Sequence, residues 1–110
     1  MTIKILGTEY VVRYAEDKDC AKIEDANGFC ELMTKEIVLN NFKETPTTLA
    51  DVGKFENKVL RHEIIHAFLY ESGLHSNSEF ALNEEMVDWI AIQFPKMAKV
   101  FKEAKCLEGE

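Results

Sequence analysis

Proline and glycine are scarce in this chain of 110 residues, which contains only 2 prolines and 5 glycines. This scarcity excludes a collagen-like protein and a disordered low-complexity chain, both of which are rich in these residues. Long apolar runs are also absent, since none approaches the roughly 20 residues needed to cross a bilayer. The first residues, MTIKILGTEYVV, do not have the layout of a signal peptide. We therefore expect a cytoplasmic protein that does not interact with membranes.

Basic residues and paired cysteines are lacking as well. Lys and Arg total 13 against 20 Asp and Glu, which gives a net charge of -7. Binding to a phosphate backbone depends on Lys and Arg, and there is no basic cluster of that kind, so we do not expect nucleic acid as a partner. The cysteines, Cys20, Cys30 and Cys106, are widely spaced and form no CxxC pair. This favours free thiols over a structural zinc knuckle, which needs close pairs of ligands.

The residues that are present predict one α+β domain over residues 1–110, with strands mostly in 1–45 and helices mostly in 46–110. Branched and aromatic residues in the first part favour a sheet of three or four strands. Residues 16–19 read as a charged, solvated loop, and residues 20–26 as a loop or an irregular strand. The expected strands are Thr2–Leu6, Glu9–Ala15, Phe29–Leu32 and Glu36–Asn40.

Two long helices are expected in the second part of the chain. The first should run from about Leu49 to about Ser72, with Gly73 at its C-terminal stop. The second should begin near residues 80–83 and run through Trp89, and Pro95 should kink or divide it. Large aromatic residues are expected in the core, namely Phe29, Phe42, Phe55 and Trp89.

The first predicted helix contains the run HEIIH at residues 62–66. Positions i and i+4 lie on the same face of a helix, so His62 and His66 can both reach one metal ion, and Zn²⁺ is a common partner of such a pair. Glu63 is rotated by about 100° from His62. It is therefore poorly placed as a ligand but well placed as the general base for a metal-activated water.

A third ligand is expected from the run NEEMVD in the second helix. Glu84 and Asp88 are four residues apart and project the same way. A catalytic zinc site needs three protein ligands and one open position, and Glu84 would complete a set of two histidines and one glutamate. Asp88 would accept a hydrogen bond from the outer ring nitrogen of a ligating histidine, for which we expect His62. Glu85 is the competing ligand, but helix phase favours Glu84.

HEIIH followed by NEEMVD resembles the gluzincin metallopeptidases, the group that includes thermolysin. The small size and the order of strands before helices resemble the minimal gluzincins and the small HExxH proteins of the ImmA/IrrE type, including phage-encoded metallopeptidases. The resemblance is strong over residues 60–94. It implies a zincin-like fold, in which the sheet packs on the HExxH helix and a second helix carries NExxxD.

The resemblance also implies a zinc-dependent peptidase acting on a peptide or protein substrate. The larger enzymes use a His or Tyr to stabilise the oxyanion, and His75 and Tyr70 are the candidates here, although a solvated loop position for His75 and ordinary core packing for Tyr70 are the simpler explanations. An extended peptide could pair with an exposed strand edge, for which residues 36–40 are a candidate. The alternative is a zinc-binding regulatory or protein-interaction domain without turnover, in which the metal stabilises the fold. The sequence does not indicate an oligomeric state.

Overall fold

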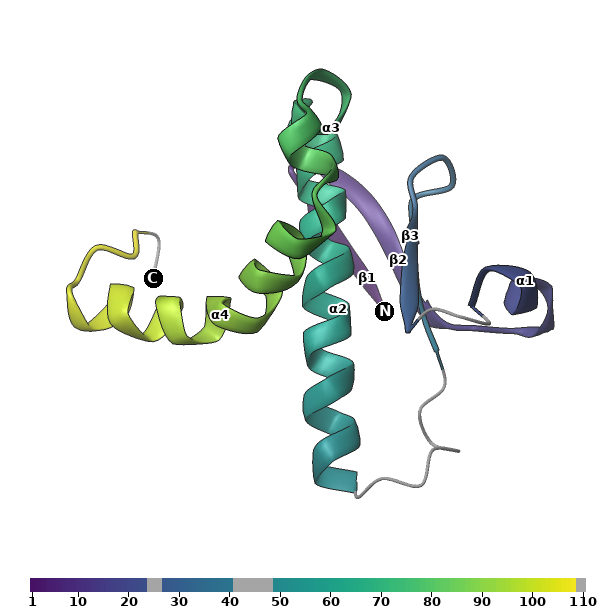
Figure 1. The fold of residues 1–110 in the computed structure, drawn as a ribbon, viewed down its shortest axis with the longest axis horizontal. Helices are drawn as coiled ribbons and strands as arrows, with labels where there is room; N and C mark the ends of the chain where they lie inside the picture. Colours follow the sequence, from purple (N-terminus) through teal and green to yellow (C-terminus); the bar gives the residue numbers. More distant parts are fainter. Residues whose placement is uncertain (24–26, 41–48, 109–110) are drawn as a thin grey trace.

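The computed structural model describes residues 1–23, 27–40 and 49–108 of the chain. It confirms the α+β class: a four-stranded mixed sheet packs on one long helix, α2 (Leu49–Glu71). A second long helix, α4 (Glu84–Glu103), contacts α2 and extends away from the sheet (Figure 1). Within the described residues, no helix is long and apolar enough to span a bilayer.

The sheet contains both antiparallel and parallel pairs, and its order is β1-β2-β4-β3. Its outer pairs, β1 with β2 and β3 with β4, are antiparallel, whereas β2 and β4 run parallel in the middle. The β1–β2 turn contains Gly7 at φ 88°, a conformation that favours glycine. The strands are β1 (Thr2–Ile5), β2 (Thr8–Tyr14), β3 (Gly28–Glu31) and β4 (Glu36–Leu39).

This strand order corrects the predicted peptide-binding edge. Residues 36–39 form β4, which is hydrogen-bonded on both sides, so the proposed edge at residues 36–40 is in the centre of the sheet. Ile37 and Val38 are fully buried there. Strand β3 is the edge strand on this side, and it is the strand that packs closest to α2.

Helix α2 lies against the sheet because one of its faces is apolar. Val59 and Ala67 of α2 are buried in the same cluster as Tyr10, Val12 and Ile37 of the sheet. The spacing of eight residues between Val59 and Ala67 keeps both side chains on one helix face. The histidine positions lie between these two contacts, so the sheet holds that part of α2 in place.

The C-terminal end of α2 is attached to the sheet by a polar cluster around Glu71. Its carboxylate accepts hydrogen bonds from Thr8 Oγ1 at 2.9 Å and Tyr10 Oη at 2.6 Å, and from Lys35 Nζ at 2.8 Å. The lysine contact, followed by the tyrosine contact, lowers the pKa of Glu71 to about 2. Helix α2 ends directly after this cluster, where Gly73 has φ 86°.

The connection between β2 and β3 differs from the prediction. Residues 17–19 form a 3₁₀ turn, and α1 (Cys20–Ile23) is a short helix rather than a loop or irregular strand. Asp19 is only 6% exposed, because its carboxylate accepts from the Arg13 guanidinium at 2.8 Å. Arg13 also donates to Glu36 at 2.8 Å. The charge of Asp19 is therefore an internal ion pair and not a solvated one.

Helix α4 begins at Glu84, directly after residues 80–83, where its start was predicted. The side chain of Asn83 accepts from the backbone N–H of Met86 at 2.8 Å and caps the helix. Pro95 lies inside α4 and does not divide it, and Figure 1 shows the helix changing direction part-way along its length. Residues 74–77 (α3) and 79–82 (a 3₁₀ turn) connect α2 to this cap.

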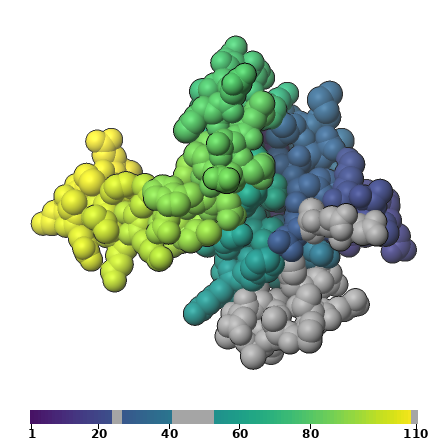
Figure 2. All heavy atoms as spheres, viewed as in Figure 1, coloured from purple at the N-terminus to yellow at the C-terminus, as the bar shows by residue number. Residues whose placement is uncertain are grey.

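Two of the aromatic residues assigned to the core are in fact exposed. Phe55 is 40% and Trp89 57% exposed, whereas Val87 and Ala91 fill the buried face of α4. Phe29 is half-buried, and Phe42 lies outside the described residues. Figure 2 shows the C-terminal part of α4 standing out from the rest of the molecule, so much of this helix has no neighbour to cover it.

Candidate metal centre

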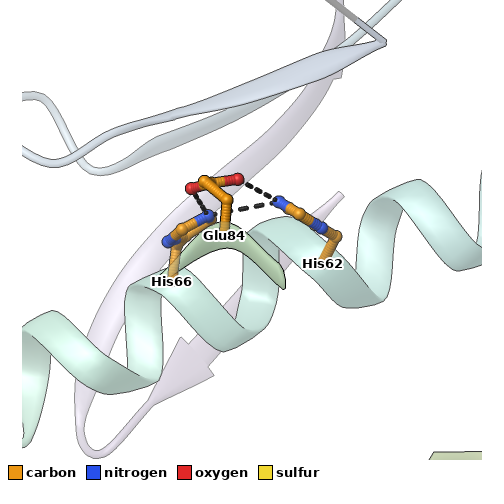
Figure 3. Close-up of side chains that lie close together, drawn as sticks. All are labelled: His62, His66 and Glu84. Atoms are coloured by element: carbon orange, nitrogen blue, oxygen red, sulfur yellow. Dashed lines mark hydrogen bonds and ion pairs between the residues drawn. The ribbon is translucent and has the colours of Figure 1, made fainter. Parts of the chain in front are cut away.

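The two histidines of HEIIH lie on one face of α2 with their Nε2 atoms 3.2 Å apart (Figure 3). Both are largely buried, with side-chain exposures of 16% for His62 and 18% for His66. Burial lowers the pKa of His66. The neutral imidazole that this favours is the form that binds a metal ion.

Glu84 reaches the same point from the first turn of α4. One carboxylate oxygen lies 3.0 Å from His62 Nε2 and the other lies 2.8 Å from His66 Nε2. The Asn83 cap fixes the start of α4, and so fixes which residue of the helix faces the histidines. The neighbouring Glu85 is exposed and is not part of this group.

The donor atoms of this group fit the demands of a divalent ion. His62, His66 and Glu84 each offer one atom, and these atoms are all within 4.8 Å of one another. Tetrahedral zinc with ligands at 2.0–2.1 Å requires ligand atoms about 3.3 Å apart, and the two Nε2 atoms lie 3.2 Å apart. Hydrogen bonds alone satisfy these three side chains poorly, because each Nε2 atom carries at most one hydrogen and can donate it to only one neighbour. The three side chains could therefore hold Zn²⁺, and two histidines with one carboxylate is a donor set that zinc accepts.

Asp88 contacts Nδ1 of His62, the ring nitrogen that faces away from the cluster. Its Oδ1 atom lies 3.1 Å from His62 Nδ1 and 2.9 Å from Lys58 Nζ. The Lys58 ammonium and, to a smaller extent, the imidazole lower the pKa of Asp88. A charged Asp88 accepts the Nδ1 hydrogen and leaves the Nε2 lone pair of His62 directed at the cluster.

Lys58 is a member of the site that the sequence reading missed. It lies four residues before His62 on α2, so it shares the face that bears both histidines. This spacing could have indicated that Lys58 belongs to the site, but a lysine on a helix is ordinarily solvated. Its ion pair with Asp88 depends on the packing of α4 against α2.

Glu63 is one of the few buried charged side chains, with an exposure of 7%. Burial, and to a smaller extent the Glu84 carboxylate, raises its pKa to about 7, while His62 acts in the opposite direction. A carboxylate with a pKa near neutrality can both accept and return a proton at physiological pH. Glu63 also lines the same cavity as the histidines.

A cavity of about 440 Å³ opens in front of the cluster between α2, the start of α4 and the edge strand β3. His75 lines this cavity, whereas Tyr70 packs edge-on against the His75 ring with centroids 5.6 Å apart. The Lys35 ammonium lies 4.5 Å from the Tyr70 ring centroid. Of the two predicted oxyanion candidates, His75 therefore faces the open space and Tyr70 lies behind it.

Cys30 of β3 also lines the cavity. Burial raises the pKa of its thiol to about 12, and the Glu63 carboxylate acts in the same direction. A thiol of this kind is protonated at neutral pH and is a poor ligand or nucleophile, and Cys30 packs partly buried against the hydrophobic core.

Comparison with known proteins adds no assignment. No protein-family model, no curated protein and no solved structure matches this chain. The interpretation of the site therefore depends on the geometry of its residues.

Proposed function

We propose that this chain is a zinc-dependent metallopeptidase of the small gluzincin kind, with His62, His66 and Glu84 as ligands. One observation carries the proposal: the Nε2 atoms of His62 and His66 on α2 lie 3.2 Å apart, and each lies 2.8 to 3.0 Å from an oxygen of the Glu84 carboxylate on α4, beside the buried carboxylate of Glu63. Among the described residues, His62, His66 and Glu84 are the group of side chains that could hold a metal ion. The open cavity in front of them leaves room for water and a substrate.

The residues of the chain divide the chemical work between them. Zinc bound by this group would acidify a water and polarise a carbonyl. Glu63 takes a proton from the water that attacks the peptide carbonyl and then delivers it to the departing amine. Its raised pKa, to about 7, suits both transfers. Asp88 keeps the imidazole of His62 in the tautomer that ligates.

His75 is the candidate for stabilising the oxygen of the attacked carbonyl. Its ring lines the cavity and is held edge-on by Tyr70. An imidazole N–H aimed at the developing negative charge stabilises the transition state more than the ground state, and so lowers the barrier. In this proposal Tyr70 is a positioning residue, because it contacts His75 and not the cavity.

The substrate would be an extended peptide or protein segment. Strand β3 is the edge strand beside the cavity, and Gly28 and Cys30 of β3 line that cavity. Main-chain pairing with this edge replaces the pairing with residues 36–40 that the sequence suggested. A cavity bounded by a strand edge favours an extended chain over a compact small molecule.

Metal analysis combined with a variant of Glu63 tests this proposal. Protein purified without added metal should contain about one zinc per chain, and the zinc-loaded form should cleave members of a peptide library. Glu63→Gln should retain zinc but lose hydrolysis by a factor of about 10² or more. Glu79→Gln, at an exposed acidic position, serves as the matched control.

Two results would contradict the peptidase proposal. Full hydrolysis by Glu63→Gln would remove the proposed base. Stoichiometric zinc without cleavage of any library member would favour the alternative, a zinc-binding regulatory or interaction domain whose metal stabilises the fold.

A further inference from the structure

The outward face of α4 carries a continuous row of exposed side chains. We call Glu85, Trp89, Ile92, Lys96 and Val100 the α4 stripe; their spacings of four, three, four and four residues place them along one side of a helix. The three apolar members are 57%, 41% and 58% exposed at Trp89, Ile92 and Val100. This row faces away from the contact with α2, which is made by Val87 and Ala91.

The stripe lies on a part of the molecule that projects. Figures 1 and 2 show α4 leaving the body of the fold, with its C-terminal part reaching outward. The radius of gyration is 15.0 Å, whereas a compact chain of this length has about 13 Å. An amphipathic helix that leaves the core of its own chain presents its apolar side chains to a partner.

The charges along α4 are divided between its two halves. Residues 84–94 contain three acidic residues and no basic one, a net charge of -3. Residues 95–105 contain four lysines and one glutamate, a net charge of +3. Glu84 and Asp88 face the histidines, so Glu85 is the acidic residue on the stripe itself.

We propose that the α4 stripe binds the same stripe of a second copy of this chain, with the two helices antiparallel about a two-fold axis. An antiparallel arrangement places Glu85 of each copy opposite the basic half of the other, whereas a parallel arrangement places the two basic halves together. Trp89, Ile92 and Val100 form the apolar centre of this interface. Exposed tryptophan and long apolar side chains at a desolvated centre contribute most to binding.

The distribution of charge favours a second copy over a lipid surface. The basic half of α4 would attract an anionic membrane, but the same surface would repel Glu85 and the acidic half that contains it. A second copy provides both signs in the required order. This inference does not depend on the proposed peptidase activity, because the stripe excludes the metal-binding residues.

Sedimentation velocity of the full 110-residue chain tests the proposal. We expect a concentration-dependent dimer between about 1 and about 300 µM protein. The dimer should weaken when salt rises from about 50 to about 500 mM, because the charge pairing is screened.

Variants locate the interface. Trp89→Ser and Val100→Ser should each raise the dimer dissociation constant by about tenfold or more. Met33→Ser, at an 83% exposed apolar position on the β3–β4 turn, is the matched control and should have no effect. Glu85→Lys should also weaken the dimer, and adding Lys96→Glu, at the basic member of the stripe, should restore part of the loss.

Three outcomes would overturn the proposal. One is a chain that stays monomeric over the whole concentration range. Another is a dimer that tolerates Trp89→Ser and Val100→Ser as well as it tolerates Met33→Ser. The third is a monomeric chain that binds vesicles of an anionic phospholipid and loses this binding in the α4 variants. That result would assign the stripe to a membrane surface.

Discussion

The guanidinium Nε of Arg61 donates a hydrogen bond of 2.6 Å to the backbone carbonyl oxygen of Ala91. In a regular helix this carbonyl would accept from the N–H of residue 95, but that residue is Pro95, which has no N–H. Arg61 of α2 thus replaces the hydrogen bond that α4 lacks. The contact joins the two helices at the residue directly before His62 and helps to place Glu84.

A double-mutant cycle tests whether Arg61 compensates for Pro95. Arg61→Met should lower the free energy of unfolding by about 1–3 kcal/mol, the usual cost of a buried acceptor that loses its donor. In a Pro95→Ala background the cost should be smaller, because residue 95 regains the N–H that can serve Ala91. Urea unfolding of the four proteins measures this coupling, and Lys54→Met on the exposed part of α2 is the control. Equal costs in both backgrounds would show that Arg61 does not compensate for Pro95.

Glu84 and Glu85 form a matched pair for testing the metal centre. Only Glu84 contacts the histidines, with oxygens at 2.8 and 3.0 Å. Glu84→Gln should weaken zinc affinity by at least about 100-fold, whereas Glu85→Gln should leave it unchanged. Competition with a chromogenic chelator measures both affinities. The reverse ranking would show that the registration of α4 on α2 differs from that described.

The cluster around Glu71 predicts a pH-dependent contribution to stability. The pKa of Glu71 is lowered to about 2 in the folded chain, against an unfolded value of about 4.3. Its contribution is therefore fully present above about pH 4.5 and is lost as the pH falls toward 2. Glu71→Gln should be less stable than the natural chain at pH 7, and the difference should shrink over this acidic window.

Thermal or urea unfolding as a function of pH checks the Glu71 prediction. Glu79→Gln changes an exposed carboxylate and should track the natural chain throughout. A stability difference for Glu71→Gln that persists unchanged at pH 2 would mean that shape, and not charge, explains the cost.

The three cysteines should differ in reactivity. Cys20 and Cys106 are exposed, whereas burial raises the pKa of Cys30 to about 12. At pH 8 only about 10⁻⁴ of a thiol with that pKa is thiolate, the reactive form. Iodoacetamide should therefore label two cysteines in the folded chain and all three in denaturant, as counted by mass spectrometry. Rapid labelling of Cys30 in the folded chain would contradict its burial.

Local periodicity predicted which side chains of the candidate site share a helix face. Spacing alone placed His62 and His66 on one helix face and put Glu84 in phase with Asp88, and the structure brings these side chains together. These relations lie within single helices, where 3.6 residues per turn fixes the geometry. The meeting of the two helices was expected for another reason, that a catalytic zinc site needs a third protein ligand, and from the resemblance to the gluzincins.

Features set by contacts distant in the sequence were not predictable in this way. Residues 36–39 read correctly as a strand, but their central position depends on parallel pairing with β2, which no local pattern encodes. Asp19 looked solvated because its partner Arg13 belongs to another element. Trp89 was assigned to the core because it is large and apolar. The buried face of α4 instead consists of the smaller Val87 and Ala91, which allow close approach to α2.

The division of the donor atoms between α2 and α4 has a mechanical consequence. Two donors are on a helix anchored to the sheet at Val59, Ala67 and Glu71, so their spacing is preserved whenever the sheet is folded. The third donor is on a helix that leaves the body soon afterwards. A bound ion would thus add a cross-link between α2 and the first turn of α4. Its loss would weaken the hold on Glu84, while the Arg61–Ala91 and Lys58–Asp88 contacts would still join the two helices.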